Sequence, residues 1–259
     1  VAAVVLFIAL GAIYYTYQET RPCANPIAYR AGEIDPRFGM SESDFIAHME
    51  QAASLWNKTT GRELFVYDPA GDVPVNLVYD TRQETADLGK TISEAQELYD
   101  AHVRALNMKK AAYELEKDAY DAEVSMWNAR GGAPKGVFAS LEAKRQALIA
   151  TQKEINADVA ALNAEARATN VQVSTYNAEA GETFEQGSYH ASREGTYIDV
   201  YEFTSKTQLV RLVAHEFGHA LGLDHVEGAG SIMYPLNTGT SLTLTEADRL
   251  ALKTLCNLE

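Results

Sequence analysis

The chain has 259 residues, 46% of them hydrophobic, and carries a formal net charge of −14 at pH 7. This length and composition suffice for a buried core and fit one modest domain with additional segments. The acidic charge argues against a nucleic-acid partner, because the phosphates of DNA or RNA would be repelled.

The first residues, VAAVVLFIALGAIYYTY, carry no charge. We expect residues 1–18 to be part of a transmembrane anchor that continues upstream, because the chain begins with Val1. Tyr14, Tyr15 and Tyr17 suit a membrane–water interface. A cleaved signal peptide is the main alternative and would make the protein secreted. A core helix of a soluble domain is the third interpretation.

The two cysteines, Cys23 and Cys256, lie near opposite ends of the part that follows this segment. In an exported protein such a pair usually forms a disulfide. We therefore predict a bond that ties the residues after the N-terminal segment to the last helix.

Residues 19–80 carry strand and helix patterns in turn. We expect a strand at 27–32 and a helix that begins at a cap, Ser41 or Ser43, and runs to about Trp56. The runs ELFVYD and VNLVYD predict two further strands, separated by the turn-rich PAGDVP.

Residues 81–180 differ in character: neither proline nor glycine occurs from Thr91 to Arg130, and neither follows GGAPKG before Gly181. The pattern predicts two long helices that fold back as an antiparallel coiled-coil hairpin about 65 Å long. Its contacts would come from a seven-residue repeat at Ile92, Tyr99, Leu106, Tyr113, Tyr120 and Trp127 and at Leu141, Leu148, Ile155, Leu162, Thr169 and Tyr176. A rod of this kind can hold a protein partner.

Residues 181–259 begin with a sheet edge in FEQGSYHAS and a strand in GTYIDVYEF. An exposed edge of this kind lets an extended peptide dock by strand addition. A helix capped by Ser205 or Thr207 follows, and a last helix begins at Thr245 with Asp248 three residues later.

Three histidines gather in AHEFGHALGLDH, within the first of these helices and the turn after it. His215 and His219 are four residues apart and share a face of the helix. Gly222 can end the helix, so that His225 returns to the other two. Three imidazoles with an open fourth position are the layout of a catalytic zinc site. Glu216 lies about 100° round the helix from His215, where it can reach a water on the metal.

The run from His215 to His225 resembles the metzincin zinc signature, and SIMYP at 231–235 is similar to the Met-turn that accompanies it. The tyrosine and proline after Met233 are closest to the matrixin branch, also called peptidase M10. The resemblance implies an α+β, zincin-like catalytic domain with a mixed sheet and an active-site helix. It also implies that Met233 forms a hydrophobic floor beneath one catalytic zinc and is not a ligand.

This resemblance covers Ile34 to Asp80 loosely and Thr183 to Cys256 more firmly. We expect residues 19–80 and 181–259 to form one catalytic domain that is interrupted by the hairpin at 81–180.

The resemblance does not extend to a loop for structural zinc or calcium, since only His190 and Asp199 are candidate ligands. We therefore expect neither a second zinc nor calcium. Matrixin propeptides carry a cysteine whose thiolate inhibits the enzyme by binding the zinc. The alternative to the disulfide is therefore that Cys23, in RPCANP, has this inhibitory role.

We expect a membrane-anchored, extracytoplasmic zinc endopeptidase of proteins or peptides, with Glu216 as general base. One alternative is a catalytically inactive zincin that serves as a coiled-coil scaffold. Retention of Glu216 speaks against it, because an inactive copy needs no base. The other alternative is a zinc hydrolase of non-peptide amides.

Overall fold

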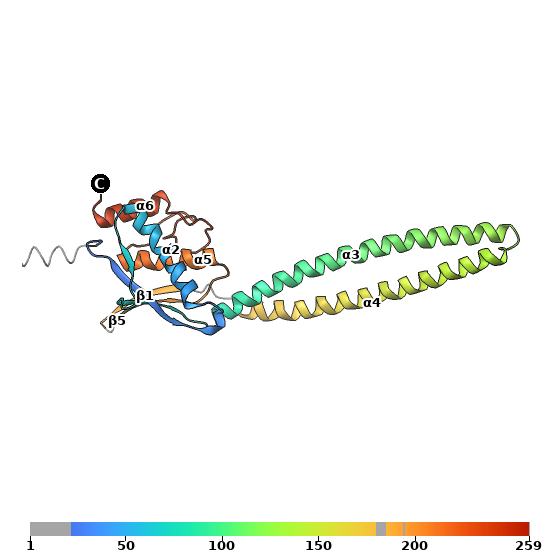
Figure 1. Cartoon of the computed structure of the whole chain (residues 1–259), viewed down its shortest axis with the longest axis horizontal. Coiled ribbons are helices and arrows are strands. Elements are labelled where there is room, and N and C mark those ends of the chain that lie inside the picture. The colour runs from blue at the N-terminus through green and yellow to red at the C-terminus, as the bar shows by residue number, and fades with distance from the viewer. Residues whose placement is uncertain (1–21, 180–184, 194, 259) are drawn as a thin grey trace, which may run out of the picture. The chain divides into compact units, whose positions relative to one another are not determined.

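The computed structural model describes residues 22–179, 185–193 and 195–258. The chain divides into two compact units (Figure 1). The first unit combines residues up to Asp87 with those from Glu182 onward, and the second is Leu88–Gly181. The sequence prediction of an anchor at residues 1–18 lies outside the described residues.

The first unit is built on a five-stranded mixed sheet with the strand order β2-β1-β3-β5-β4. Three neighbouring pairs are parallel, and β4 pairs antiparallel with β5 at one edge. The strands are β1 (Ile27–Ile34), β2 (Phe65–Tyr67), β3 (Val73–Leu77), β4 (Gly187–Ser192) and β5 (Gly195–Val200). The structure confirms a mixed sheet with a sheet edge at 187–192.

Helices α2 (Glu42–Thr60) and α5 (Lys206–Leu221) cover one face of this sheet (Figure 1). Alternate strand residues face them, and the most deeply buried side chains include Tyr29, Val75, Ile198, Trp56 and Phe217. The expected helix starts are confirmed, since Ser41 accepts a hydrogen bond from Asp44 N and Ser205 accepts one from Gln208 N. A short 3-10 turn, η1 (Pro36–Phe38), precedes α2.

The start of β3 differs from the sequence expectation. PAGDVP was expected to be a turn, but Val73 and Pro74 belong to β3 and pair with Tyr29 and Arg30 of β1. Local turn propensity is a weak preference, and pairing with a neighbouring strand overrides it here. The turn is therefore shorter than PAGDVP suggests.

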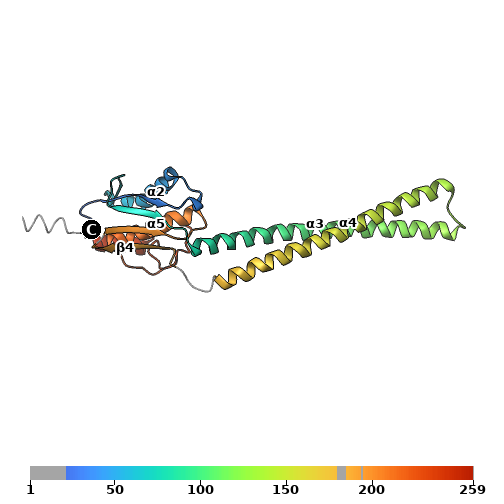
Figure 2. The same ribbon diagram turned by 90° about the horizontal axis from the view of Figure 1, so that it is seen from below.

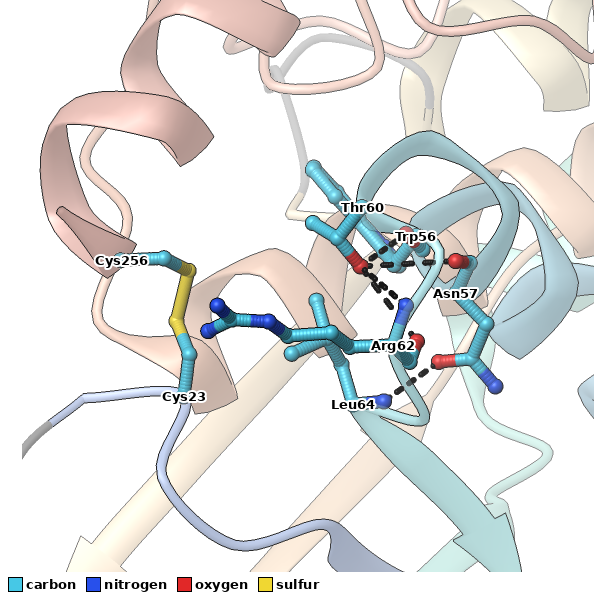
Figure 3. The surroundings of a disulfide bond; sticks show 7 residues. All are labelled: Cys23, Trp56, Asn57, Thr60, Arg62, Leu64 and Cys256. Carbon is cyan, nitrogen blue, oxygen red and sulfur yellow. Dashed lines mark hydrogen bonds between the residues drawn. A yellow bond between two sulfur atoms is a disulfide. The ribbon is translucent and has the colours of Figure 1, made fainter. Parts of the chain in front are cut away.

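The last helix, α6 (Glu246–Cys256), begins with the expected cap at Thr245. Its final residue forms the expected disulfide with Cys23 (Figure 3). The bond lies beside the turn between α2 and β2, and the side chain of Arg62 extends from that turn toward the bond. Within that turn, Thr60 Oγ1 accepts a hydrogen bond from Arg62 N. The disulfide therefore joins the segment before β1 to the end of α6, next to a turn that has its own hydrogen bond.

The second unit consists of two long helices that run antiparallel to each other and are joined by a short turn (Figure 2). They belong to α3 (Thr81–Ala129), whose first residues lie in the first unit, and to α4 (Lys135–Glu179). Leu106, Ile155 and Leu162 form a small buried cluster between them. Lys109 bridges the helices by contacting Asp158 at 2.6 Å.

No helix within residues 22–179, 185–193 and 195–258 is long and apolar enough to cross a lipid bilayer.

Candidate metal centre

Helix α5 carries the first two of the three clustered histidines through the middle of the first unit. Its apolar residues are buried on nearly every side, from Leu209 and Val213 to Phe217. Gly222 ends the helix with φ 98°, a left-handed conformation that glycine adopts without steric cost. The chain therefore turns sharply after His219 and brings His225 back toward the helix.

The three histidines meet as the sequence spacing predicts. One ring nitrogen from each of His215, His219 and His225 lies within 4.8 Å of the others. Four-coordinate zinc holds nitrogens at 2.0–2.1 Å, so that they lie about 3.4 Å apart. The separation of these nitrogens is therefore of the size that one metal ion needs.

Backbone carbonyls set the orientation of two of the rings. His215 Nδ1 donates to Ile232 O at 2.7 Å, and His219 Nδ1 donates to Leu223 O at 2.9 Å. Each Nε2 consequently carries a lone pair, and the two Nε2 atoms lie 3.1 Å apart. Two lone pairs at this distance repel each other, whereas a cation between them would be attracted to both.

The surroundings also favour neutral imidazoles. Burial lowers the pKa of His215 to about 4, and the hydrogen bond to Ile232 O opposes this shift only in part. Burial likewise lowers the pKa of His219. Metal ligation requires the neutral form of histidine, so these residues are ready to bind a metal at neutral pH.

Glu216 is buried on a different face of α5 from His215 and contacts the edge strand β4. Its side chain is 3% exposed. A Cβ added to Gly187 would lie 3.1 Å from Glu216 Oε1, closer than such atoms usually approach, so the carboxyl packs tightly against the backbone of β4. Burial raises the pKa of Glu216 to about 8, with a further contribution from Glu185, while a hydrogen bond from the Tyr189 backbone lowers it.

Met233 lies fully buried against α5, packed on Gly218 between the two helical histidines. A Cβ on Gly218 would overlap the Met233 sulfur and lie 3.1 Å from the Trp56 ring. Trp56 Nε1 in turn donates to Ala214 O at 2.9 Å. The helix, the methionine and the tryptophan therefore form a close-packed support on which the histidines stand.

Two buried charged residues, Asp248 and Arg211, hold the loop that contains Met233, a role that the local sequence pattern does not predict for either. Asp248 accepts hydrogen bonds from Ile232 N and Met233 N, both at 3.0 Å. Arg211 donates to Ser231 O at 3.0 Å, and also to three other groups of the same loop, Gly230 O, Asn237 Oδ1 and Ser241 O. A lone arginine within the apolar run LVRLVA was the available signal for the second residue.

The other candidate ligands have different partners. His190 Nε2 lies 2.7 Å from Ser188 Oγ, and its ring stacks on Tyr197. Asp199 accepts hydrogen bonds from Asn76 and Tyr201. Cys23 is bonded to Cys256, which removes the thiol that an inhibitory cysteine would need.

The profile of the matrixin family, peptidase M10, matches residues 24–256. No curated protein matches the chain.

Proposed function

The chain belongs to the matrixin family of metzincins, whose members are zinc metallopeptidases, and from this premise we propose that it is a zinc-dependent endopeptidase. The observation that carries the proposal is the pair of Nε2 atoms of His215 and His219, which lie 3.1 Å apart with a nitrogen of His225 nearby. A buried glutamate next to such a cluster is the second component that peptide hydrolysis requires.

His215, His219 and His225 would hold the zinc ion, and their donor set fits it. Three neutral nitrogen ligands leave a fourth position open, as in catalytic zinc sites. A zinc ion bound there would lower the pKa of a bound water molecule and polarise the carbonyl group of the substrate. Met233 serves as the floor of the site and contributes no ligand.

We assign Glu216 the role of general base. Its buried carboxyl has a raised pKa and is held by the Tyr189 backbone. A carboxyl whose pKa lies near the working pH can accept a proton from water and return it to the leaving amine. Glu216 therefore moves the proton in both halves of the reaction.

The proposed substrate is an extended segment of a peptide or protein that pairs with the free edge of β4. Among the described residues this strand ends the sheet, and its pairing is with β5 along the inner edge. Because the Tyr189 N–H of β4 contacts Glu216, a substrate strand added to that edge would pass close to the base.

We propose an extracytoplasmic location, with residues 1–18 as a membrane anchor. Matrixins are generally extracellular, and the Cys23–Cys256 disulfide fits an oxidising compartment. We further propose that residues 81–180 act as a coiled-coil domain inserted in a catalytic domain of residues 19–80 and 181–259. Contacts of Leu106 with Ile155 and Leu162 support this division.

The decisive experiment compares zinc content with hydrolysis of a diverse peptide library. Glu216→Gln should retain zinc and lower the rate about 10²–10⁴-fold, because the base alone is removed. His219→Ala should lose both zinc and hydrolysis. Glu246→Gln, which changes an exposed carboxylate of α6, is the control and should behave as the unmodified chain.

Two results would contradict the proposal. Hydrolysis by Glu216→Gln at the unmodified rate would refute the assignment of the base. A zinc-loaded, folded chain that cleaves no peptide would favour a scaffold or a hydrolase of other amides.

A further inference from the structure

Helix α3 carries a second apolar repeat, separate from the one that contacts α4. Ten positions alternate in steps of three and four residues from Leu98 to Ala129, a stretch of about 47 Å. All ten are exposed and apolar: Leu98, Ala101, Ala105, Met108, Ala112, Leu115, Ala119, Ala122, Met126 and Ala129. We call this set the outer stripe.

The outer stripe is distinct from the contacts within the hairpin. Tyr99, Leu106 and Tyr113 pack toward α4 in the buried cluster, whereas every member of the stripe stays exposed. Leu98, Met108, Leu115 and Met126 expose 57%, 69%, 74% and 40% of their surface. The hairpin therefore leaves a continuous apolar strip of helix that no residue within 22–179, 185–193 and 195–258 covers.

Exposure alone does not account for this pattern. The position two residues after Leu98 is equally exposed along the helix, yet it is polar in each of five heptads: Asp100, Asn107, Glu114, Asp121 and Asn128. Alanine is also a strong helix former, but helix propensity does not place leucine and methionine in water. A 3,4 repeat on one helix is the pattern by which it pairs with another helix.

We propose that the outer stripe is a self-association surface, on which α3 of a second copy packs antiparallel about a two-fold axis. Centring the stripe on its own midpoint sets large residues opposite small ones. Leu98 faces Ala129 of the second copy, Met126 faces Ala101, Met108 faces Ala119 and Leu115 faces Ala112. Each large knob thus meets a small residue, and the two-fold axis repeats every contact.

The charges beside the stripe fit the same register. On one flank, Arg104 lies about five residues along the helix axis from Asp118 of the second copy, within reach of its long side chain, and on the other flank Lys109 lies about two residues from Glu116. Opposite charges at such flanking positions determine the direction of pairing in coiled coils. Lys109 already contacts Asp158 of α4, so Glu116 would join an existing cluster of charges.

A parallel pair of helices would have the opposite properties. It would set Leu98 against Leu98 and Ala105 against Ala105, leaving wide and narrow layers in succession. Its flanks would bring Arg104 near Lys109 and Asp118 near Glu123, which are like charges. Size and charge therefore both favour the antiparallel arrangement of two copies.

The first test measures the dimer dissociation constant of the full chain by analytical ultracentrifugation. Leu115→Glu should weaken association about 100-fold or more, because the two-fold axis introduces two buried charges. Asn107→Glu, at an exposed polar position of the same helix, should leave it unchanged. An unmodified chain that is monomeric, or a Leu115→Glu chain that associates normally, would overturn the proposal.

The second test exchanges the flanking charges. Arg104→Asp and Asp118→Arg should each impair self-association, since each places like charges near one another on the same flank twice. An equimolar mixture of the two should form a mixed dimer, because both interface pairs then have opposite charges. If the mixture stays monomeric while each variant remains helical, the antiparallel register is wrong.

These variants lie outside the catalytic machinery, and residues 1–21 are identical in all of them. Differences among them consequently report on α3. Zinc content and peptide hydrolysis should stay at the unmodified level in each variant. Failure of the self-association proposal would therefore appear in the dissociation constant, whereas failure of the proposed peptidase function would appear in zinc content and hydrolysis.

Discussion

The core around α5 is assembled from segments far apart in the sequence, whereas the contacts between α3 and α4 repeat along two helices that follow one another. Trp56 of α2 hydrogen-bonds Ala214 of α5 across 158 positions, and Asp248 of α6 holds the backbone of Met233. In the hairpin, Leu106 meets Ile155 and Leu162 in a repeat of seven residues.

The two units therefore differ in how far the effect of a single substitution should extend. In the first unit, a substitution in one element reaches the histidines through buried hydrogen bonds and close packing. In the hairpin, each layer contacts only its neighbours, so a change should stay local.

Removing the buried carboxylate of α6 should have the largest effect. Asp248→Ala should lower the free energy of unfolding by about 3–5 kcal/mol, because buried N–H groups lose their acceptor and Arg211 loses a nearby charge. Zinc affinity should fall as well, since Ile232 O orients His215. Urea unfolding and zinc titration measure both effects. Glu246→Ala on the same helix should change stability by about 0.5 kcal/mol or less; equal costs would refute the role of Asp248.

Opening the disulfide should have a somewhat smaller effect. Cys23→Ser with Cys256→Ser should lower the free energy of unfolding by about 2–4 kcal/mol, because the bond closes a loop of 233 residues in the unfolded chain. The same loss should appear when the unmodified protein is reduced. If denaturant unfolding of the oxidised and reduced forms coincides, the bond contributes no stability to the first unit.

One type of substitution should act in opposite directions in the two units. Gly218→Ala should cost about 1–3 kcal/mol and weaken zinc binding, because its methyl group would overlap Met233. Gly136→Ala in α4 meets no atom within 4 Å and should stabilise the chain by up to about 1 kcal/mol. Thermal unfolding of the two variants decides the matter, and a loss at both positions would contradict the contrast.

Removing the hairpin should have the smallest effect on the zinc site. The cut should follow Asp87, because Gln83 at the start of α3 hydrogen-bonds both Phe203 N and Phe203 O. Replacing residues 88–179 with a short glycine-rich linker should change the free energy of unfolding by about 1 kcal/mol or less, since loop entropy varies slowly with length.

Zinc content and short-peptide hydrolysis by this shortened chain are the readouts. Both should match those of the full chain, while cleavage of the natural protein target should fall. A shortened chain that fails to fold would show that the hairpin belongs to the core of the first unit.

Much of the site could be predicted because its signals are local. The four-residue step from His215 to His219, the helix-ending Gly222 and the caps at Ser205 and Thr245 all act over one or two turns of helix. The seven-residue repeat likewise predicted α3 and α4, because helical periodicity is visible in consecutive residues.

Tertiary structure alone decided the rest, and Asp248 shows why. The sequence indicates its local role, in which its side chain accepts a hydrogen bond from Thr245 N and completes the cap of α6. Its bonds to Ile232 N and Met233 N arise only when α6 folds against the loop beside the three histidines. The start of β3 and the burial of Arg211 depend in the same way on partners distant in sequence. Periodicity and capping show how a segment satisfies the hydrogen bonds of its own backbone. The role of a buried charge depends instead on the groups that the folded chain brings into contact with it.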